Sequence, residues 1–207
     1  MRKIFFGFML AFIFNLQPLV GYCQPALEPA EKGTQVQDQD GLYQITVIDD
    51  GYSISKGVKD VTELVPTGTD VYQNGNYLVQ VFAVDRIPAD ARGDLRKSFD
   101  WINQSVMMKR AKKKVQILSD QKRDFKGIKA LYVGSIFPGK TSKGAMNLTV
   151  IQSYGFAYVN LVFYDKDRLF WIYYSRPETE AEFIPKPRIT GEMKEKFDKF
   201  LDGITLS

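Results

Sequence analysis

The sequence of 207 residues contains no histidine and a single cysteine, Cys23. Histidine is the commonest general base and the commonest metal ligand in proteins. Its absence excludes a Ser-His-Asp triad, a Cys-His dyad and a zinc site built from imidazole groups. A lone cysteine also cannot form a disulfide bond within the chain. We therefore expect no catalytic residue, no bound metal and no cofactor.

Long apolar runs are scarce, and the clearest one lies at the N-terminus, from Ile4 to Phe14. The basic start MRK precedes this run, and small residues follow it at Gly21 and Cys23. This order is typical of a secretory signal peptide. The run is also shorter than the roughly 20 residues that a membrane-spanning helix needs. We predict that residues 1–23 are a signal peptide and that the protein is exported, either periplasmic or secreted.

Lipidation of Cys23 is the alternative fate for this N-terminus. Tyr22, directly before the cysteine, matches a bacterial lipoprotein site poorly, so lipoprotein anchoring is the less favoured expectation. Cleavage would also change the charge. The full chain holds 28 basic and 24 acidic residues, and removal of Arg2 and Lys3 leaves a mature protein that is close to neutral.

Two regions are expected after residue 23. Residues 24–41 are polar, contain proline and show no periodicity, which predicts a flexible leader. Residues 42–207 are apolar enough for one domain with a sizeable core. Within them, segments rich in β-branched and aromatic residues predict strands. These segments are LYQITV and YSIS around a turn at Asp50-Gly51, then NYLVQVFAV, KVQILSDQKRDF, GIKALYVGSIF, AMNLTVIQSY, FAYVNLVFY and RLFWIYYS.

The period changes to that of a helix in two places. Four apolar residues after Pro88 are spaced by four, three and four positions, which places them on one face of a long central helix; they are Leu95, Phe99, Ile102 and Val106. Near the C-terminus a second helix is expected after Thr190 as N-cap. Its apolar face would hold Met193, Phe197, Phe200, Leu201 and Ile204. Grouped strands with two helices predict an α+β fold, an antiparallel sheet flanked by both helices (an α/β/α sandwich).

This order of elements resembles the PsbP/DcrB-like group of extracytoplasmic α/β/α sandwich domains. The resemblance rests on the strand pair around DDGYSI, on YLVQVFAVDRIP before a long helix, on RDFKGIKALYVGS, on the hairpin VFYDKDRLFWIYYS and on the ending EKFDKFLDGITLS. It covers most of residues 42–207. Members of the group are mostly accessory or binding proteins, and one related fold binds a small GTPase. No ligand motif of the group matches this chain residue by residue, so the resemblance implies no site.

The segment GSIFPGKT, residues 134–141, matches the pattern of a phosphate-binding loop. Such a loop presents successive backbone N–H groups to phosphate at the start of a helix. Pro138 has no backbone N–H group, although the loop needs one at this position to face a phosphate. The residues after Thr141 would also make a poor first turn of a helix. Only 66 residues follow Thr141 (207 − 141), too few for the rest of a nucleotide-binding core. We expect a hairpin loop, PGKTSKG, between two antiparallel strands.

The densest basic run is KRAKKK at the end of the central helix. Residues 109–129 contain nine basic and two acidic residues, whereas residues 28–70 contain nine acidic and three basic residues. The structural interpretation is that lysines at a helix C-terminus complement the helix dipole and keep that exposed end of the helix soluble. The alternative is a surface for an anionic partner, either an acidic protein or a membrane surface; nucleic acid is not expected in this compartment. The residues expected to bind such a partner are Lys109, Arg110, Lys112, Lys113 and Lys114.

Two further groups of residues have a structural and a functional interpretation. Aromatic residues of the late strands are expected to form core, although they could line an apolar pocket; they are Tyr154, Phe156, Tyr158, Phe163, Tyr164, Phe170, Trp171, Tyr173 and Tyr174. The pairs Asp49-Asp50 and Asp165 with Asp167 are expected in turns, because neither has the spaced oxygen ligands of a calcium loop.

The sequence therefore favours an exported, non-enzymatic accessory or binding domain of the cell envelope. The alternative is an enzyme, either an NTPase that uses residues 134–141 or a hydrolase that uses carboxylates. An active site requires polar side chains that converge in a cleft, and the sequence offers no paired carboxylates at a recognisable spacing.

Overall fold

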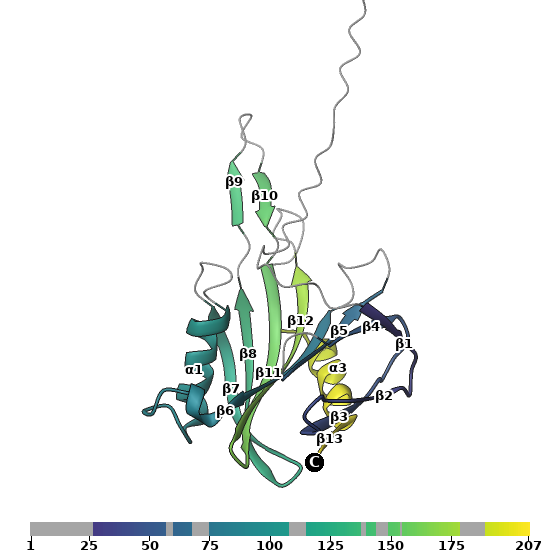
Figure 1. The fold of residues 1–207 in the computed structure, drawn as a ribbon. Helices are drawn as coiled ribbons and strands as arrows, with labels where there is room; N and C mark the ends of the chain where they lie inside the picture. Colours follow the sequence, from purple (N-terminus) through teal and green to yellow (C-terminus); the bar gives the residue numbers. More distant parts are fainter. Residues whose placement is uncertain are drawn as a thin grey trace, which may run out of the picture.

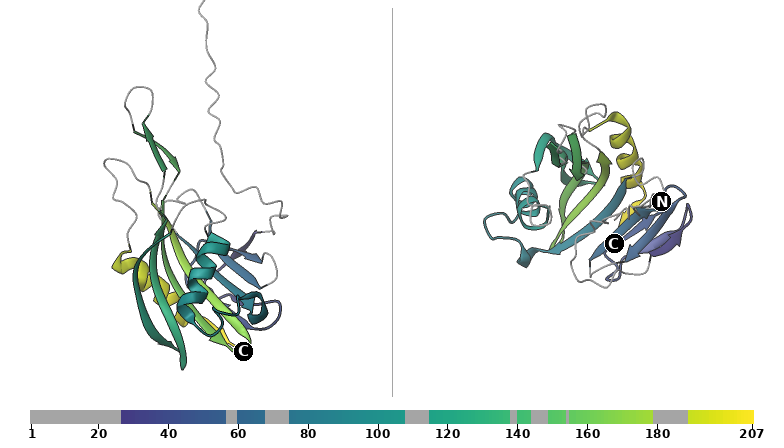
Figure 2. Two further views of the ribbon diagram at one scale, coloured as in Figure 1. Left: turned by 90° about the vertical axis from the view of Figure 1, so that its left-hand side faces the viewer. Right: turned by 90° about the horizontal axis from the view of Figure 1, so that it is seen from above.

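The structure is a computed structural model, and it describes residues 27–56, 60–67, 75–107, 115–137, 140–143, 149–153, 155–178 and 189–207. Its main feature is one antiparallel sheet of eight strands with a helix on each face (Figures 1 and 2). In spatial order the strands are β1 (Leu27–Ala30), β4 (Tyr52–Lys56), β5 (Val61–Pro66), β6 (Asn76–Ala83), β12 (Arg168–Glu178), β11 (Gly155–Asp165), β8 (Ile128–Phe137) and β7 (Gln116–Phe125). The predicted α+β class is confirmed. None of the helices in these ranges is both long and apolar enough to span a bilayer.

Helix α1 (Leu95–Ile102) covers one face of the sheet, and it continues as a π-helical stretch, η2 (Asn103–Met107). A 3-10 turn, η1 (Val84–Arg86), and the loop after it lead from β6 to α1. Asp94 caps the helix, because its carboxylate accepts hydrogen bonds from the N–H groups of Arg96 and Lys97 at 2.9 and 3.1 Å. Phe99 and Ile102 are fully buried against the sheet. Of the predicted apolar face, Phe99 and Ile102 are buried and Leu95 is partly buried, whereas Val106 packs on the same core from η2, because the α-helix is eight residues long and ends at Ile102.

Helix α3 (Gly191–Asp202) covers the opposite face, as the view from above shows (Figure 2). Thr190 is its N-cap, and the Thr190 hydroxyl accepts a hydrogen bond from the Met193 N–H at 3.2 Å. Its buried face holds the four expected residues Met193, Phe197, Phe200 and Leu201. Ile204, the fifth, is buried but lies outside the helix, in the short strand β13 (Ile204–Leu206). The helix ends earlier than the apolar spacing predicts because the chain turns at Gly203 into that strand.

The N-terminal half departs from the sequence prediction in its strand pairing. β3 (Tyr43–Thr46) and β4 were expected to form a hairpin around Asp50-Gly51. Instead, β3 lies between β2 (Gln35–Gln37) and β13 in a separate three-stranded sheet, whereas β4 pairs with β1 and β5 in the large sheet. The turn at Gly51 therefore carries the chain from one sheet to another. A turn motif specifies a reversal, but long-range pairing decides which strands meet.

The prediction of a flexible leader is wrong for residues 27–41. Leu27–Ala30 forms the edge strand β1, and Gln35–Gln37 pairs with β3. Ala30 and Val36 are buried in the core that α3 covers. This polar, proline-bearing segment shows no strand pattern in its sequence. It forms strands because β4 and β3 pair with it.

Candidate functional site

The five basic residues expected to bind a partner lie outside the described residues. Lys109, Arg110, Lys112, Lys113 and Lys114 fall between Met107, the last residue of η2, and Val115, which precedes β7. Their role as a partner-binding surface stays a prediction.

The segment that matches a phosphate-binding loop is built from strands. β8 continues to Phe137, and β9 (Lys140–Lys143) pairs antiparallel with β10 (Thr149–Ser153) in a two-stranded ribbon that projects beyond the main sheet (Figure 1). The expectation that no helix begins at Lys140 is confirmed. The expectation of a hairpin loop is wrong for residues 140–143, which form a strand. The helix start on which a phosphate-binding loop depends is not present at Lys140.

Packing explains the glycine that opens this motif. A Cβ atom at position 134 would lie 2.7 Å from the Ser119 hydroxyl and 3.2 Å from a side-chain carbon of Ile189. Gly134 therefore lets the segment before α3 approach β8 closely. Its role is close packing, which is a common reason for glycine inside a strand.

The aromatic strands form core, as expected. Phe163 and Phe170 stack face to face, with ring centroids 4.9 Å apart, in the core that α3 covers. Trp171 is buried in the other core, beneath α1. Phe156, Tyr158 and Tyr173 are half-buried at the margin of that second core, and Tyr154 lies outside the described residues.

A buried amide that the sequence analysis did not single out joins three strands. Asn160 on β11 is fully buried, and its amide N–H groups donate to the Val133 carbonyl and the Ser135 hydroxyl on β8, each at 3.1 Å. Its amide oxygen accepts from the indole N–H of Trp171 on β12 at 3.1 Å. The only signal in the sequence is one amide within the apolar run FAYVNLVFY. These bonds satisfy the buried polar groups, so the cluster is structural.

The two acidic pairs have the turn roles that were expected. Asp50 accepts a hydrogen bond from the Lys32 N–H at 2.9 Å, and Asp49 pairs with Lys199 at 3.1 Å. Asp165 is the last residue of β11, and Asp167 lies in the turn to β12. Within the described ranges no three acidic or sulfur-bearing side chains are grouped closely enough to hold a metal ion.

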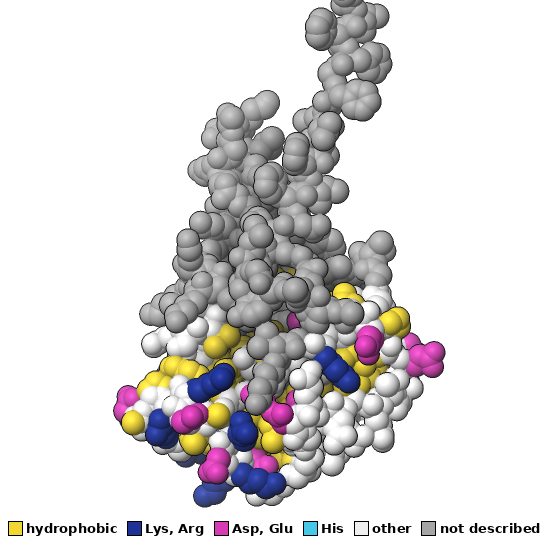
Figure 3. All heavy atoms as spheres, in the orientation of Figure 1, with side chains coloured by type: hydrophobic (Ala, Val, Ile, Leu, Met, Phe, Trp, Pro, Cys, Tyr) yellow, Lys and Arg dark blue, Asp and Glu magenta, His cyan; other side chains and the backbone are white. Residues whose placement is uncertain are grey.

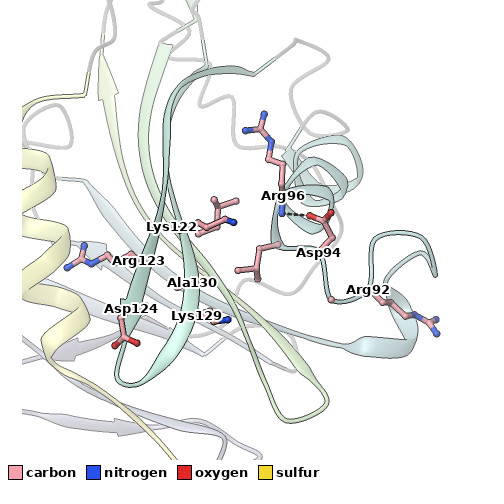
Figure 4. Close-up of a pocket in the computed structure, with 11 residues that line it drawn as sticks. Arg92, Asp94, Arg96, Lys122, Arg123, Asp124, Lys129 and Ala130 are labelled. Carbon is pink, nitrogen blue, oxygen red and sulfur yellow. Dashed lines mark hydrogen bonds between the residues drawn. The ribbon is translucent and has the colours of Figure 1, made fainter.

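The structure does form a hollow between the start of α1 and the β7–β8 hairpin (Figure 4). Its volume is about 730 Å³. One wall comes from the loop and first turn of α1, and the other comes from the two strands. The lining residues are Arg92, Gly93, Asp94, Leu95, Arg96, Lys122, Arg123, Asp124, Lys129, Ala130 and Leu131. Five of them are basic and two are acidic, so basic residues outnumber acidic ones in the lining.

Three of the five basic side chains are already engaged. Arg92 extends away from the hollow and donates to the carbonyls of Ile87 and Asp85. Arg96 pairs with Asp100 and Asp120. Arg123 extends to the other face of the sheet, where it pairs with Asp198 of α3 at 2.6 Å.

The two carboxylates of the hollow are engaged as well. Asp94 caps α1, and Asp124 accepts a hydrogen bond from the Gly127 N–H in the hairpin turn at 3.0 Å. Among the described contacts, neither carboxylate forms an ion pair with Lys122 or Lys129, the remaining two basic residues of the hollow. This leaves Lys122 and Lys129 as the cations for which the described residues supply no acceptor.

Lys122 and Lys129 lie on neighbouring strands, on the side of the sheet that faces α1 (Figure 4). Lys122 is opposite Leu131, and Lys129 is opposite Asp124, so the two lysines are diagonal neighbours across the hairpin. Diagonal positions are about 7–8 Å apart, within reach of two long side chains that meet at one anion. Leu131 is buried beneath them and gives the hollow an apolar floor.

This geometry suits one class of ligand, an acidic group attached to an apolar body. The ammonium groups can donate to a carboxylate, and the leucine floor can take the attached carbon atoms. The basic excess of residues 109–129 was visible in the sequence, but the spacing of these residues did not show which of them lack partners. On the face shown in Figure 3, basic and acidic side chains alternate with apolar ones over its lower part.

Comparison with known proteins supports the fold and leaves the function to be argued from the site. No protein-family model matches the sequence, and no curated protein is similar to it. Among solved structures, the cyanobacterial PsbP protein (CyanoP) of Synechocystis sp. PCC 6803 aligns with a TM-score of 0.51 and 12% identity, over 84% of this chain and 92% of that chain. The Ran-binding protein Mog1p of Saccharomyces cerevisiae aligns with a TM-score of 0.52 and 9% identity, over 86% of this chain and 96% of that chain. The resemblance to PsbP is confirmed at the level of fold, and the chain has the Mog1/PsbP-like fold.

Proposed function

We propose that this protein is an exported, non-enzymatic accessory domain of the cell envelope that binds an acidic segment of a partner protein. The observation that carries the proposal is the pair Lys122 and Lys129, two cations above an apolar floor to which the described residues offer no acceptor. The fold is consistent with a binding role, because one structure of this fold is a Ran-binding protein. The basic run from Lys109 to Lys114, which lies outside the described residues, stays a second candidate for the same partner.

The physical contribution of such a field is mainly kinetic. Clustered charges on a molecule that is otherwise near neutral steer an oppositely charged partner and raise its association rate more than its final affinity. Exposed charges are screened by salt over about 8 Å at physiological ionic strength. Binding should therefore weaken steeply between low and physiological salt.

The test is affinity capture from envelope extracts with three baits. The first bait is the natural chain, and the second carries Lys122→Glu with Lys129→Glu. The third carries Lys194→Glu, which reverses an exposed charge on α3, on the other face of the sheet. We expect one or more acidic proteins to be captured by the first and third baits, to be lost with the second, and to be released by salt. A partner captured equally by all three baits would overturn the hollow as the binding site.

A further variant tests the residues that precede β7. Reversal of Lys112 and Lys113 to glutamate should slow association with the captured protein, because it removes positive charge that steers an acidic partner. The fold should stay intact, since the apolar face of α1 is untouched. Cosedimentation with phosphatidylglycerol vesicles separates the membrane alternative. If the vesicles bind the natural chain and the double Lys122/Lys129 variant does not bind them, the partner is a lipid surface and the acidic-protein proposal fails.

A further inference from the structure

Strand β7 is one edge of the eight-stranded sheet. It is ten residues long, and in the part of the chain that the structure describes it pairs only with β8. A bulge between Ile117 and Ser119 interrupts the pairing, and the ladder is regular from Ser119 to Phe125. An edge strand presents a row of backbone N–H and C=O groups that can pair with another strand.

The side chains of the regular part divide cleanly between the two faces. Lys122 lines the hollow, and Asp120 pairs with Arg96 of α1, so these two residues face α1. Asp124 follows them at the same spacing of two. Arg123 faces α3, where it pairs with Asp198. Along the edge, the row that faces α1 therefore reads Asp120, Lys122, Asp124, with charges that alternate in sign.

We propose that β7 pairs antiparallel with β7 of a second copy of this chain, about a two-fold axis at Gln121. In this register Asp120 of each copy lies opposite Lys122 of the other, which gives two opposite-charge pairs on the α1 face. The dimer therefore competes with the acidic segment of the proposed function for Lys122, and only Lys129 stays available to that segment in both states. Ser119 lies opposite Arg123 on the other face. The interface is isologous, as a two-fold axis requires. The two eight-stranded sheets join edge to edge, and both α1 helices lie on the same side.

Charge complementarity selects this register over its neighbours. An axis at Lys122 would place the two Lys122 ammonium groups together and Asp120 opposite Asp124. An axis at Arg123 would pair Lys122 with Asp124 of the other copy, but it would also bring the two Arg123 guanidinium groups together, whereas the axis at Gln121 brings two neutral side chains together. Opposite charges directly across a strand pair are favourable, and like charges are unfavourable. Asp120 can serve two partners because it uses one oxygen, Oδ2, toward Arg96 and a carboxylate offers about four acceptor sites.

Charged side chains on an edge often prevent strand pairing. Here the alternation has the opposite consequence for one register, since each charge meets its opposite in the second copy. An acidic peptide strand would not fit this edge equally well, because two of its three α1-facing residues are aspartates. The charge row therefore favours a second copy as the occupant.

The first test is a site-specific cross-link in a chain with Cys23→Ser. Gln121→Cys places the two introduced thiols opposite each other on the axis, and mild oxidation should give a disulfide-linked dimer. Glu28→Cys is the matched control, an exposed position on β1, the strand at the opposite edge of the eight-stranded sheet. Efficient cross-linking at 121 and none at 28 is expected. Equal cross-linking at positions 121 and 28, or none at 121, would overturn the proposal.

The second test mixes two charge variants and measures sedimentation. Asp120→Lys alone and Lys122→Glu alone each turn two attractive pairs into two repulsive ones, so the dimer dissociation constant should rise by about tenfold or more. A mixture of the two variants restores both pairs and should dimerise as well as the natural chain. Circular dichroism checks that each variant folds. If the natural chain remains a monomer, or if the mixture is no better than either variant, β7 is not the interface.

Discussion

At the scale of single residues, Asn160 is a buried amide with three hydrogen-bond partners across the large sheet. Replacement of Asn160 by leucine keeps the volume similar but leaves the Trp171 indole N–H without its acceptor. We expect the free energy of unfolding to fall by about 1–3 kcal/mol, the cost of one buried donor left unpaired. Urea unfolding measures this loss, and Gln44→Ala is the control. That variant removes an exposed hydrogen bond to Gln35 and should change stability by no more than about 0.5 kcal/mol. Equal losses for the two variants would contradict the role of Asn160.

A second residue-scale prediction concerns pH. Burial raises the pKa of Tyr52 from 10.0 to about 12, and burial also raises the pKa of Tyr43, Tyr77 and Tyr132. Above pH 10 the unfolded chain releases these protons more readily than the folded chain does. The free energy of unfolding should therefore stay level up to about pH 10 and fall between about pH 10 and 12.

Replacement of Tyr52 by phenylalanine removes one of these groups, so the alkaline fall should become shallower. Urea unfolding at a series of pH values measures the slope for both chains. Spectrophotometric titration of the tyrosines in the folded state gives an independent check. Phenols that all titrate at the ordinary pKa near 10 would contradict the burial shown by the structure.

At the scale of elements, the contact between β8 and the segment before α3 depends on Gly134. Alanine at this position would bring a methyl group 3.2 Å from Ile189 and 2.7 Å from the Ser119 hydroxyl. The hydroxyl can rotate away, but Ile189 has to shift. We expect a loss of about 1–3 kcal/mol in the free energy of unfolding.

Gly191, at the start of α3, is the matched control. A methyl group there meets no atom within 4 Å, and alanine is more favourable than glycine in a helix by about 1 kcal/mol. Gly191→Ala should leave stability unchanged or raise it. If Gly134→Ala were equally harmless by thermal and urea unfolding, the glycine would have no packing role and would need another explanation.

Elements with a strong local pattern were predictable, and their partners were not. The spacing of Phe99 and Ile102, and that of Phe197 and Phe200, identified both helices and their buried faces. The pairing of β3 with β2 and β13 was missed because the turn at Gly51 suggested a hairpin. The hollow was missed because its two walls come from segments that are separate in the sequence, residues 92–96 and residues 122–131.

At the scale of the whole molecule, we expect the mature protein to begin at Gln24. The basic start, the apolar run and the small residues before this position match a cleaved signal peptide. Intact-mass spectrometry of the exported protein should show the loss of residues 1–23. A chain that retains Met1 would contradict cleavage, and a diacylglycerol group on Cys23 would support the lipoprotein alternative instead.

The sequence by itself determined the fold class, the two amphipathic helices and the exclusion of histidine and disulfide chemistry. These properties follow from composition and from periodicities of two and 3.6 residues, which are local. Tertiary structure alone decided that residues 27–37 join the sheets, that β7 is an edge, and that Lys122 and Lys129 line the hollow with no acceptor among the described residues. Ion pairs and strand neighbours form between residues that are distant in the chain. Lys122 and Arg123 are neighbours in the chain, but they lie on opposite faces of the sheet, and Asp198 of α3 stands beside Arg123 alone.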